Sequence, residues 1–572
     1  MIKHILFSLY ACLLFVIVLA EDEAAKKTGN THSYIKGDKI DLVVDKIWPR
    51  GNPSESYDYY YLPFCGEEEQ DRLNQNLGAD MTGSRRVKTK YDLPFDTQVE
   101  KFKKAVENKF KALMYYDDVP IIVPIGSVVD DRVFLNTQLN FIFTFNEDNV
   151  VEVSIVPDQE KRTELTNPKS VEQITFTYSA YWSETEKTFS NRMSRFQELY
   201  SFNQELEIQW FSIVNSLVLV VVLTSFLAFI ILRILKRDYQ LYEEDLDDDD
   251  KEETGWKLVH TDVFRFPSNI NLLAAILGNG VHLLGLIFCI LSLAILGLYY
   301  SDYSYNAMYT SLIIAYTLTT GISGYISGSY YKQFGGERWV NNVLLTVILF
   351  ALPTFIIWAI LNTIALSYQS SAAFQFKTIA GILALYFLVS FPLQLIGAIT
   401  AKNFGKSFDA PCRTKKVPRE IPPSVWYKGG AVQVLVAGFL PFSAIYIELY
   451  YVFVSIWGHY TYAPFPIVFL VFVILIMVTS CINIAMVYLM LSQEDHKWWW
   501  RSILCGGASS WFIYAYSFSY YLDTQMNGLL QTAFFFGYVL IACYGFFLMM
   551  ATVGFLSSLS FVKRIYKVIK CD

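Results

Sequence analysis

The chain has 572 residues and a net charge of −7, and 53% of its residues are hydrophobic. This composition is typical of a membrane protein with a soluble extension and excludes an ordinary soluble globule. The negative net charge and the absence of a basic domain argue against a nucleic-acid partner.

Residues 1–20 have the pattern of a secretory signal peptide. Lys3 gives a basic start, residues 5–19 form a short apolar core, and small residues precede the acidic pair that follows. We therefore predict cleavage between Ala20 and Glu21, which would place the next segment in the lumen of the secretory pathway. The alternative is an uncleaved membrane anchor.

Residues 21–210 are predicted to form a lumenal, mainly β domain. Large apolar side chains alternate over 139–145 and again over 151–155, with turn residues between them, which predicts a hairpin. Further strands are expected at 40–44 and 174–178. We expect a β-sandwich-like domain with one packed helix.

The expected helix has apolar residues at helical spacing and a capping box at its start. The apolar positions are Val99, Phe102, Val106, Phe110 and Leu113. Thr97 and Glu100 supply the predicted capping box.

The membrane domain, 211–572, contains nine apolar stretches long enough to cross a bilayer, since a spanning helix needs about 20 apolar residues. The nine predicted spans are 214–235, 272–298, 307–331, 339–365, 378–400, 432–457, 464–491, 503–522 and 528–559. The fold class is therefore a polytopic α-helical membrane protein whose nine transmembrane helices follow the lumenal domain.

Lysine and arginine cluster in the loops that this topology places in the cytosol, whereas the short lumenal loops between spans hold only Lys377. This asymmetry follows the positive-inside rule, which supports a cytosolic C-terminal tail at 560–572. The first cytosolic loop, 236–270, departs from the rule because 243–250 is a run of acidic residues. Such a run is usually a solvated segment, and a docking or cation-binding role is the alternative.

No nucleophile elbow, phosphate-binding loop or metal-ligand spacing occurs in the sequence. The cysteines are scattered through spans and loops. We therefore predict that the protein is not an enzyme and has no catalytic, cofactor-binding or metal-binding residues.

Several short motifs lie in a characteristic order along the chain. They are YYYLPFC at 59–65, QWFSIVNS at 209–216, GWKLVHTDVFR at 255–265, YKQFGG at 331–336, PCR at 411–413, PREIPP at 418–423, PFSAIYIELYY at 441–451 and EDHKWWWRS at 494–502. Together they resemble the nonaspanins, the transmembrane 9 superfamily, from about residue 40 to 572.

This resemblance implies a protein of Golgi and endosomal membranes that sorts other membrane proteins to the surface, especially those with glycine-rich spans. It implies no enzymatic activity and no cofactor. The expected partners are the lipid bilayer, membrane-protein cargo and the COPI coat, which would bind a tail signal formed by Lys570 and Asp572. The alternative for the tail is simple anchoring of its basic residues at anionic headgroups.

Glu448 and His282 are the ionisable candidates inside the spans. A carboxylate in hydrocarbon is costly unless it faces protein or a cavity. Helix rise places the two residues about 8 Å apart in depth, which predicts a hydrated polar pocket in the lumenal half of the bundle. A transporter or channel built around Glu448 is therefore the alternative function, and a hydrogen bond between packed helices is the structural alternative.

Two further patterns concern packing. Gly321, Gly324 and Gly328 form a small-residue stripe, either for internal helix packing or for contact with cargo helices. The tryptophans at 498–500, beside basic residues, are expected to form an aromatic belt at the cytosolic interface.

Overall fold

The structure, a computed structural model, describes most of residues 41–64, 95–187, 255–295, 304–457 and 465–568, together with the short segments 74–76 and 85–87 and parts of 218–240. The predicted signal peptide and its cleavage site, the acidic run and the tail residues Lys570 and Asp572 lie outside the described residues. The first predicted span falls in the incompletely described part.

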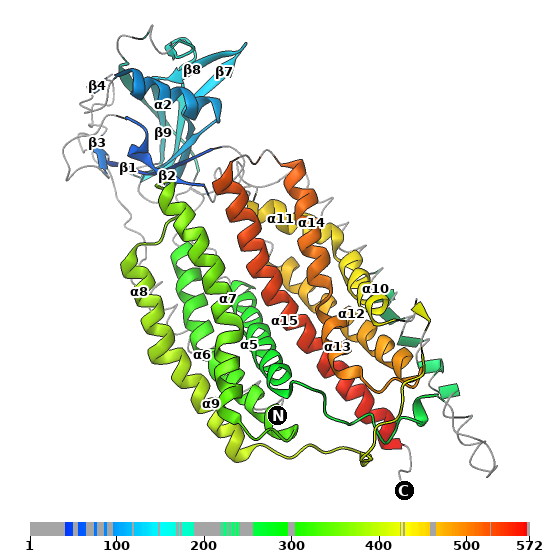
Figure 1. The fold of residues 1–572 in the computed structure, drawn as a ribbon. Coiled ribbons are helices and arrows are strands. Elements are labelled where there is room, and N and C mark those ends of the chain that lie inside the picture. The colour runs from blue at the N-terminus through cyan, green and yellow to red at the C-terminus, as the bar shows by residue number, and fades with distance from the viewer. Residues whose placement is uncertain are drawn as a thin grey trace.

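Among the described residues, the N-terminal region contains three sheets and the helix α2, which lie above the helical bundle (Figure 1). The first sheet has the order β2-β1-β5-β6, with β3 also paired to β1, and the second has the order β10-β9-β12-β4. The third sheet has the order β11-β8-β7. The strands are β1 (Asp41–Trp48), β2 (Tyr57–Asp58), β3 (Asn74–Asn76), β4 (Arg85–Val87), β5 (Lys111–Tyr116), β6 (Val119–Pro124), β7 (Gly126–Val129), β8 (Arg132–Asn136), β9 (Gln138–Asn146), β10 (Asn149–Pro157), β11 (Arg162–Glu164) and β12 (Phe176–Glu184).

The predicted hairpin is present, because β9 pairs antiparallel with β10 and aligns Phe143 with Val153. Phe141 and Phe143 are buried, as the alternation of β9 requires. On its other side β9 pairs with β12 in parallel, which sequence alternation did not indicate. The strands share one hydrophobic core, so the sheets form a single packed unit.

The predicted helix is α2 (Phe95–Glu107), and its buried face contains Val99, Phe102 and Val106. The capping-box prediction is wrong, because α2 begins two residues before Thr97. Glu100 instead forms an exposed ion pair with Lys104 one turn later, at 3.2 Å. The apolar spacing located the helix but extended it too far, because α2 ends at Glu107 and Leu113 lies in β5. Phe110 lies between the two elements.

Long helices follow the later predicted spans closely. They are α5 (Ile270–Ile295), α6 (Ser304–Gln333), α7 (Trp339–Ser367), α8 (Phe376–Leu385) continued by a π-turn into α9 (Phe391–Phe404), α10 (Gly430–Ala444), α11 (Tyr446–Trp457), α12 (Phe465–Leu491), α13 (Trp498–Gly507), α14 (Ser509–Asp523) and α15 (Leu529–Val568). Two of the expected spans are thus divided, one between α10 and α11 and the other between α13 and α14.

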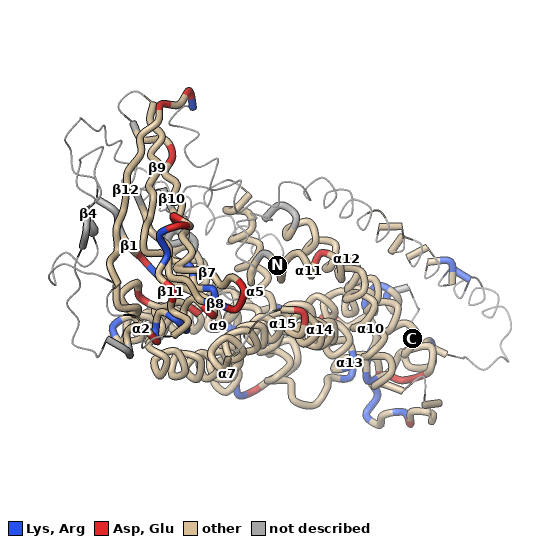
Figure 2. The backbone as a smooth tube through the Cα atoms, turned by 90° about the horizontal axis from the view of Figure 1, so that it is seen from above, with Lys and Arg blue, Asp and Glu red and all other residues tan. Residues whose placement is uncertain are grey.

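Within the described residues, five helices are long and apolar enough to cross a membrane, or six if α10 and α11 count as one bent span. The divided pair α13–α14 consists of two short helices and does not meet this criterion. The helical bundle carries few charged residues; Lys, Arg, Asp and Glu gather in the sheet region and at the ends of the bundle (Figure 2). This distribution fits a membrane-embedded bundle.

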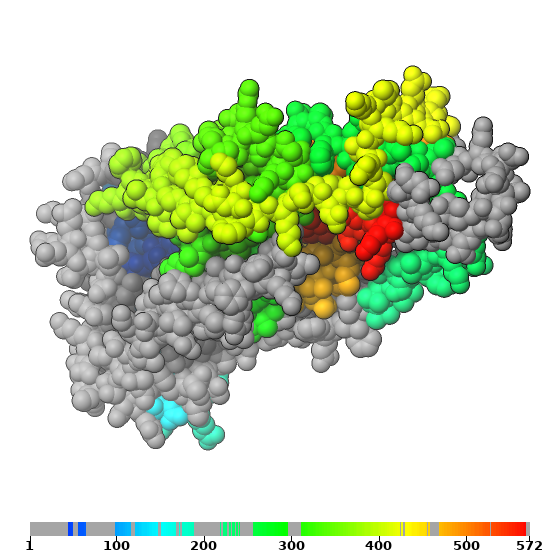
Figure 3. All heavy atoms as spheres, turned by 90° about the horizontal axis from the view of Figure 1, so that it is seen from below, coloured from blue at the N-terminus to red at the C-terminus, as the bar shows by residue number. Residues whose placement is uncertain are grey.

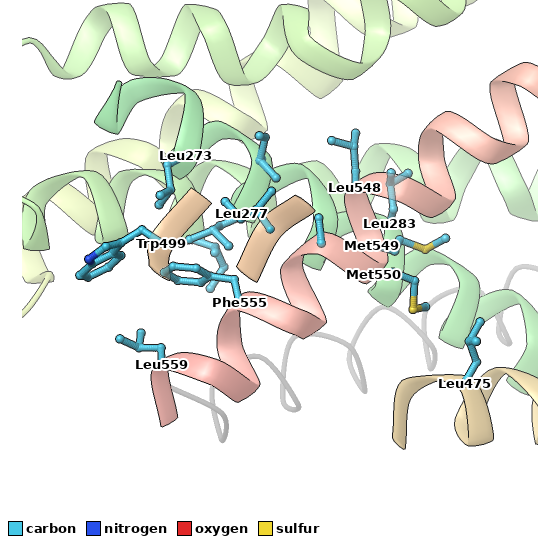
Figure 4. Close-up of a cluster of buried hydrophobic side chains, with 14 of the residues drawn as sticks. Leu273, Leu277, Leu283, Leu475, Trp499, Leu548, Met549, Met550, Phe555 and Leu559 are labelled. Carbon is cyan, nitrogen blue, oxygen red and sulfur yellow. The ribbon is translucent and has the colours of Figure 1, made fainter. Parts of the chain in front are cut away.

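The centre of the bundle is a continuous hydrophobic core in which α5 packs against α15. Leu273 and Leu277 of α5 lie in the same cluster as Met550 and Phe555 of α15, and Leu475 of α12 borders it (Figure 4). Gly280 allows α5 and α15 to approach each other closely, because a side-chain carbon at this position would collide with Thr552 of α15.

The sheet region rests on one end of the bundle through residues just before β2. The Ser56 carbonyl accepts hydrogen bonds from the Ser371 amide at 2.8 Å and from the Ser370 hydroxyl at 2.7 Å. Gln531, near the start of α15, donates its side-chain amide to the Glu55 carboxylate. These contacts fix the sheet region to the α7–α8 loop and to α15, at the end of the bundle opposite the C-terminus (Figure 1).

Candidate functional site

The span predicted at 432–457 is broken near its middle. Helices α10 and α11 meet at Ile445 and are bent by 63°. Pro441 lies inside α10 and has no N–H to donate, so the last turn of α10 is already weakened. A broken helix inside a membrane exposes backbone polar groups, which are tolerated only where protein or a water-filled cavity surrounds them.

Glu448 lies in the first turn of α11, directly after this break. Its side chain is 6% exposed, and its Oε2 atom has no hydrogen-bond partner among the described residues. Leu449 and Phe453, on the same buried face of the helix, belong to the central core. The carboxyl group therefore points into the bundle and not toward lipid.

Aromatic side chains of α14 and α15 surround the buried face of α11. Phe453 packs against Tyr516 and Tyr520 of α14 with ring centroids 5.6 Å and 5.2 Å apart, and against Phe535 of α15 at 6.2 Å. Tyr446 contacts the same Tyr516 at 5.3 Å. The break is therefore held between packed helices, which gives Glu448 a fixed position.

His282 has an environment of its own on α5. It is buried, and its Nε2 atom lies 3.2 Å from the Tyr316 carbonyl oxygen of α6. Its ring also packs against the Tyr316 ring, with centroids 4.8 Å apart. No direct interaction joins His282 to Glu448 in the described part of the chain, so a hydrated pocket shared by both stays a prediction.

The glycine stripe of α6 faces α9. A side-chain carbon at Gly324 would collide with the Gln394 carbonyl oxygen of α9, and one at Gly328 would lie 3.0 Å from Ala401. Gly397 of α9 makes the reciprocal close contact with the Gly321 carbonyl oxygen. These contacts favour the internal-packing interpretation, because α9 already covers the stripe.

A ladder of polar side chains joins the other face of α6 to α7. The Asn342 amide donates to the Ser327 hydroxyl at 2.8 Å, and Ser327 is 2.7 Å from the Thr346 hydroxyl. Asn279 of α5 donates to the Thr346 carbonyl at 2.9 Å. Most polar groups here thus have protein partners, and this part of the bundle is structural in character.

The end of the bundle opposite the sheet region gathers motifs that are far apart in the sequence. Trp498 donates its indole N–H to the Val263 carbonyl at 2.9 Å, and the Tyr566 hydroxyl donates to the Trp256 carbonyl at 2.7 Å. Five sequence segments therefore meet at this end: 255–265, 411–413, 418–423, 494–502 and the end of α15. Four of these five segments are motifs identified in the sequence, but the sequence did not predict that they would meet.

Asp262 is the charged centre of this assembly. Its Oδ1 atom accepts from Arg265 at 2.6 Å, and its Oδ2 atom accepts from the Arg419 backbone N–H at 3.2 Å. Burial alone would raise the pKa of Asp262, but the hydrogen bonds from Arg265 and Arg419 and the nearby positive charges hold it below its usual value. Burial lowers the pKa of the neighbouring His496.

The aromatic-belt prediction is wrong for two of the three tryptophans. Trp498 is 0% and Trp499 2% exposed, and their rings stack on each other with centroids 4.5 Å apart. Phe555 of α15 packs beside both rings. The repeated tryptophans thus form a core at this end of the bundle, and only Trp500 has a partly exposed position.

Among the described residues, no group of three or more His, Cys, Asp or Glu side chains is placed to hold a metal ion. The strongest candidate site is therefore Glu448 at the helix break. The sequence indicated the residue, because a carboxyl group stood in an apolar run, but the break beside it was not predicted.

Comparison with known proteins identifies a matching family and relatives that are similar over nearly the whole chain. Residues 56–529 match the family model described as Endomembrane protein 70. The chain is 44% identical to Transmembrane 9 superfamily member 4 of Arabidopsis thaliana, over 99% of both chains. It is 43% identical to "Putative phagocytic receptor 1b" of Dictyostelium discoideum, over 100% of both, and 40% identical to Transmembrane 9 superfamily member 1 of Bos taurus, over 98% of this chain and 97% of the relative. No solved structure matches significantly.

Proposed function

The chain belongs to the Endomembrane protein 70 family of transmembrane 9 proteins, and from this premise we propose that it sorts other membrane proteins in Golgi and endosomal membranes. The observation that carries the proposal is the family match across nearly the whole chain, on a multi-pass membrane protein. The proposed orientation places the sheet region in the lumen and the C-terminus in the cytosol, as the signal peptide and the positive-inside pattern indicate.

Cargo recognition in this proposal uses lipid-facing surfaces of the bundle. The glycine stripe of α6 is covered by α9, so an arriving helix would need another face. The outer surface of α8, α9 and the π-turn between them is one, because Leu388 of the turn and Ile396 of α9 are exposed there and open space surrounds Gly381 of α8. In a bilayer these side chains contact lipid or a partner helix.

Isolation of the full-length protein under mild detergent, with identification of the associated membrane proteins, tests the sorting function. We expect a reproducible set of membrane-protein partners, enriched over an unrelated multi-pass protein of the same membrane. Loss of the protein should then shift those same partners between the Golgi and the cell surface. Partners whose distribution does not change would contradict sorting.

The tail provides a separate test of location. If Lys570 and Asp572 bind the COPI coat, K570A/D572A should move the protein from the Golgi toward later membranes. The control variant K563A/K567A removes two lysines of the same tail region but keeps Lys570 and Asp572. It should remain in the Golgi. Unchanged location of K570A/D572A would show that the tail serves only as an anchor.

Transport is the second candidate function, and the Glu448 geometry favours it. A buried carboxyl group without a described partner, beside a broken helix, is the arrangement that transporters use near the middle of the membrane. The test is flux of monovalent cations or protons into liposomes that contain the purified protein. Flux that disappears in Glu448→Gln would support transport, and no flux above protein-free liposomes would exclude it for these ions.

A further inference from the structure

The loop between α9 and α10 combines positive charge with exposed apolar side chains. Between residues 405 and 423 it carries five basic residues and two acidic ones, in a chain whose net charge is −7. Val417 is 79% exposed, and Trp426, just before α10, is 80% exposed. Such side chains are unusual on a surface that faces only water.

The backbone of this loop is fixed to the bundle. The Lys415 amide donates to the Thr261 carbonyl at 3.2 Å, and the Lys415 carbonyl accepts from Arg265 at 2.7 Å. Two positions beyond Val417, the Arg419 amide is held by Asp262 at 3.2 Å. The segment is thus anchored on both sides of Val417 while its side chains remain exposed.

Three cations of this segment have no acidic partner among the residues that the structure describes. Arg413, Lys415 and Lys416 are exposed, and none of them forms an ion pair with another described residue. Arg419 differs, because it lies 3.3 Å from Glu494. The backbone contacts therefore present Arg413, Lys415 and Lys416 as a basic cluster around Val417.

The loop that carries the basic cluster joins two apolar helices at this end of the bundle. The loop leaves α9 and returns to α10, so both of its ends are at the membrane boundary. In the view from below, this yellow segment crosses the end of the bundle and reaches the edge of that face (Figure 3). Exposed cations beside an apolar side chain, in a loop that joins two apolar helices, match the headgroup layer of an anionic leaflet.

We propose that the basic cluster of Arg413, Lys415 and Lys416, with Val417 and Trp426 as apolar anchors, is a binding surface for anionic phospholipid headgroups. The surface lies at the end of the bundle opposite the sheet region, which the proposed orientation places in the cytosol. Charge complementarity selects phosphate-bearing lipids, and the fixed backbone lowers the entropy that binding would otherwise cost. The structural role of the loop, joining the motifs around Asp262, does not use these side chains.

The test uses the full-length protein reconstituted in phosphatidylcholine membranes that contain trace spin-labelled phosphatidylserine or spin-labelled phosphatidylcholine. Electron paramagnetic resonance measures the fraction of each lipid that the protein immobilises. We expect the wild type to prefer phosphatidylserine several-fold, because exposed basic residues near the surface attract anionic headgroups. Higher salt should weaken this preference.

R413Q/K415Q/K416Q should reduce the preference to nearly one, and R413K/K415R/K416R should retain it. K101Q/K104Q/K161Q removes the same charge from the sheet region and should behave as the wild type. The proposal is overturned if the wild type shows no preference or if the glutamine variant retains it. An equal loss in the charge-conserving variant would also contradict it, since the effect would then come from a disturbed loop.

Discussion

The α6–α9 interface and the α10–α11 break are two polar regions within the same bundle. They differ in whether their buried polar groups have hydrogen-bond partners. At the first, glycines bring two helices into backbone contact, and Gln394 donates to Ser323 at 3.3 Å. At the second, the helix is bent by 63° and the Glu448 carboxyl keeps one oxygen without a described partner. Neighbouring helices pack against both regions, but at the α10–α11 break a buried carboxyl oxygen lacks a described partner.

This difference distinguishes polar groups that stabilise helix packing from polar groups that serve a function. A polar group that its neighbours satisfy stabilises the packing of helices, and its loss lowers stability. A buried carboxyl group without a partner is a cost to stability, so its presence points to a role outside folding. Substitutions in the two regions should therefore differ in whether they change the amount of protein or its activity.

The largest effect on stability is expected at the α6–α9 interface. Gly324→Leu places a side chain where even one carbon meets the Gln394 carbonyl oxygen. Helices α6 and α9 must separate, and overpacking of this kind costs about 1–3 kcal/mol, with higher values where backbone must move. Protein abundance and thermal stability in detergent measure the loss.

Gly381→Leu is the matched control, because Gly381 is helical and has open space around it. It should leave abundance unchanged or slightly raised, since glycine is a poor helix former. Equal abundance of the two variants would break the claim that α9 closes the stripe.

A second loss of stability, of similar size, is expected at Asp262. Asp262→Ala removes the acceptor for Arg265 and for the Arg419 backbone, which should cost about 2–3 kcal/mol because the group is buried and partnered. Glu100→Ala removes an exposed ion pair of similar spacing and should cost less than about 0.5 kcal/mol. Thermal unfolding of both variants gives the comparison, and similar losses would show that Asp262 does not organise this end.

Acidification should weaken the same end of the bundle by a smaller amount. The folded-state pKa of His496 is lowered, so the unfolded chain binds the proton more readily and stability falls as pH drops below about 6.5. The contribution of Asp262, whose pKa is also lowered, is complete above about pH 4 and is lost only below it. Unfolding temperatures at pH 7.5 and 5.5 should therefore differ less in His496→Gln than in the wild type, and an identical difference would exclude His496.

The smallest effect on stability is expected at Glu448. Glu448→Gln keeps the shape of the side chain and replaces a buried carboxyl group, whose Oε2 atom lacks a described partner, so abundance should equal or exceed that of the wild type. Activity, measured as cargo delivery or ion flux, should fall. A drop in abundance comparable to that of Gly324→Leu would mean that Glu448 is a structural residue and would remove the contrast between the two regions.

Patterns with a strong physical period were predicted well from the sequence. The alternation around Phe141 and Phe143 located the β9–β10 hairpin, and the apolar stretch at 339–365 corresponds to α7 almost residue for residue. Both succeed because burial imposes a period of two on strands and a minimum length on spans.

Features that depend on distant contacts could not be predicted. Trp498 and Trp499 appeared as an interfacial belt because their local context is basic, but packing against Phe555 buries them. The bend at Ile445 lies four residues after Pro441, and no local signal distinguishes a kinked span from a broken one. At the candidate site, sequence identified Glu448, whereas its orientation into the bundle and its environment required the structure.

The most direct test of the proposed function is quantitative mass spectrometry of surface membrane proteins in cells that lack the protein and are then supplied with wild type or Glu448→Gln at equal abundance. A defined set of membrane proteins should leave the surface upon loss of the protein, return with wild type and not return fully with Glu448→Gln. A surface proteome that is unchanged by loss of the protein would contradict the sorting function.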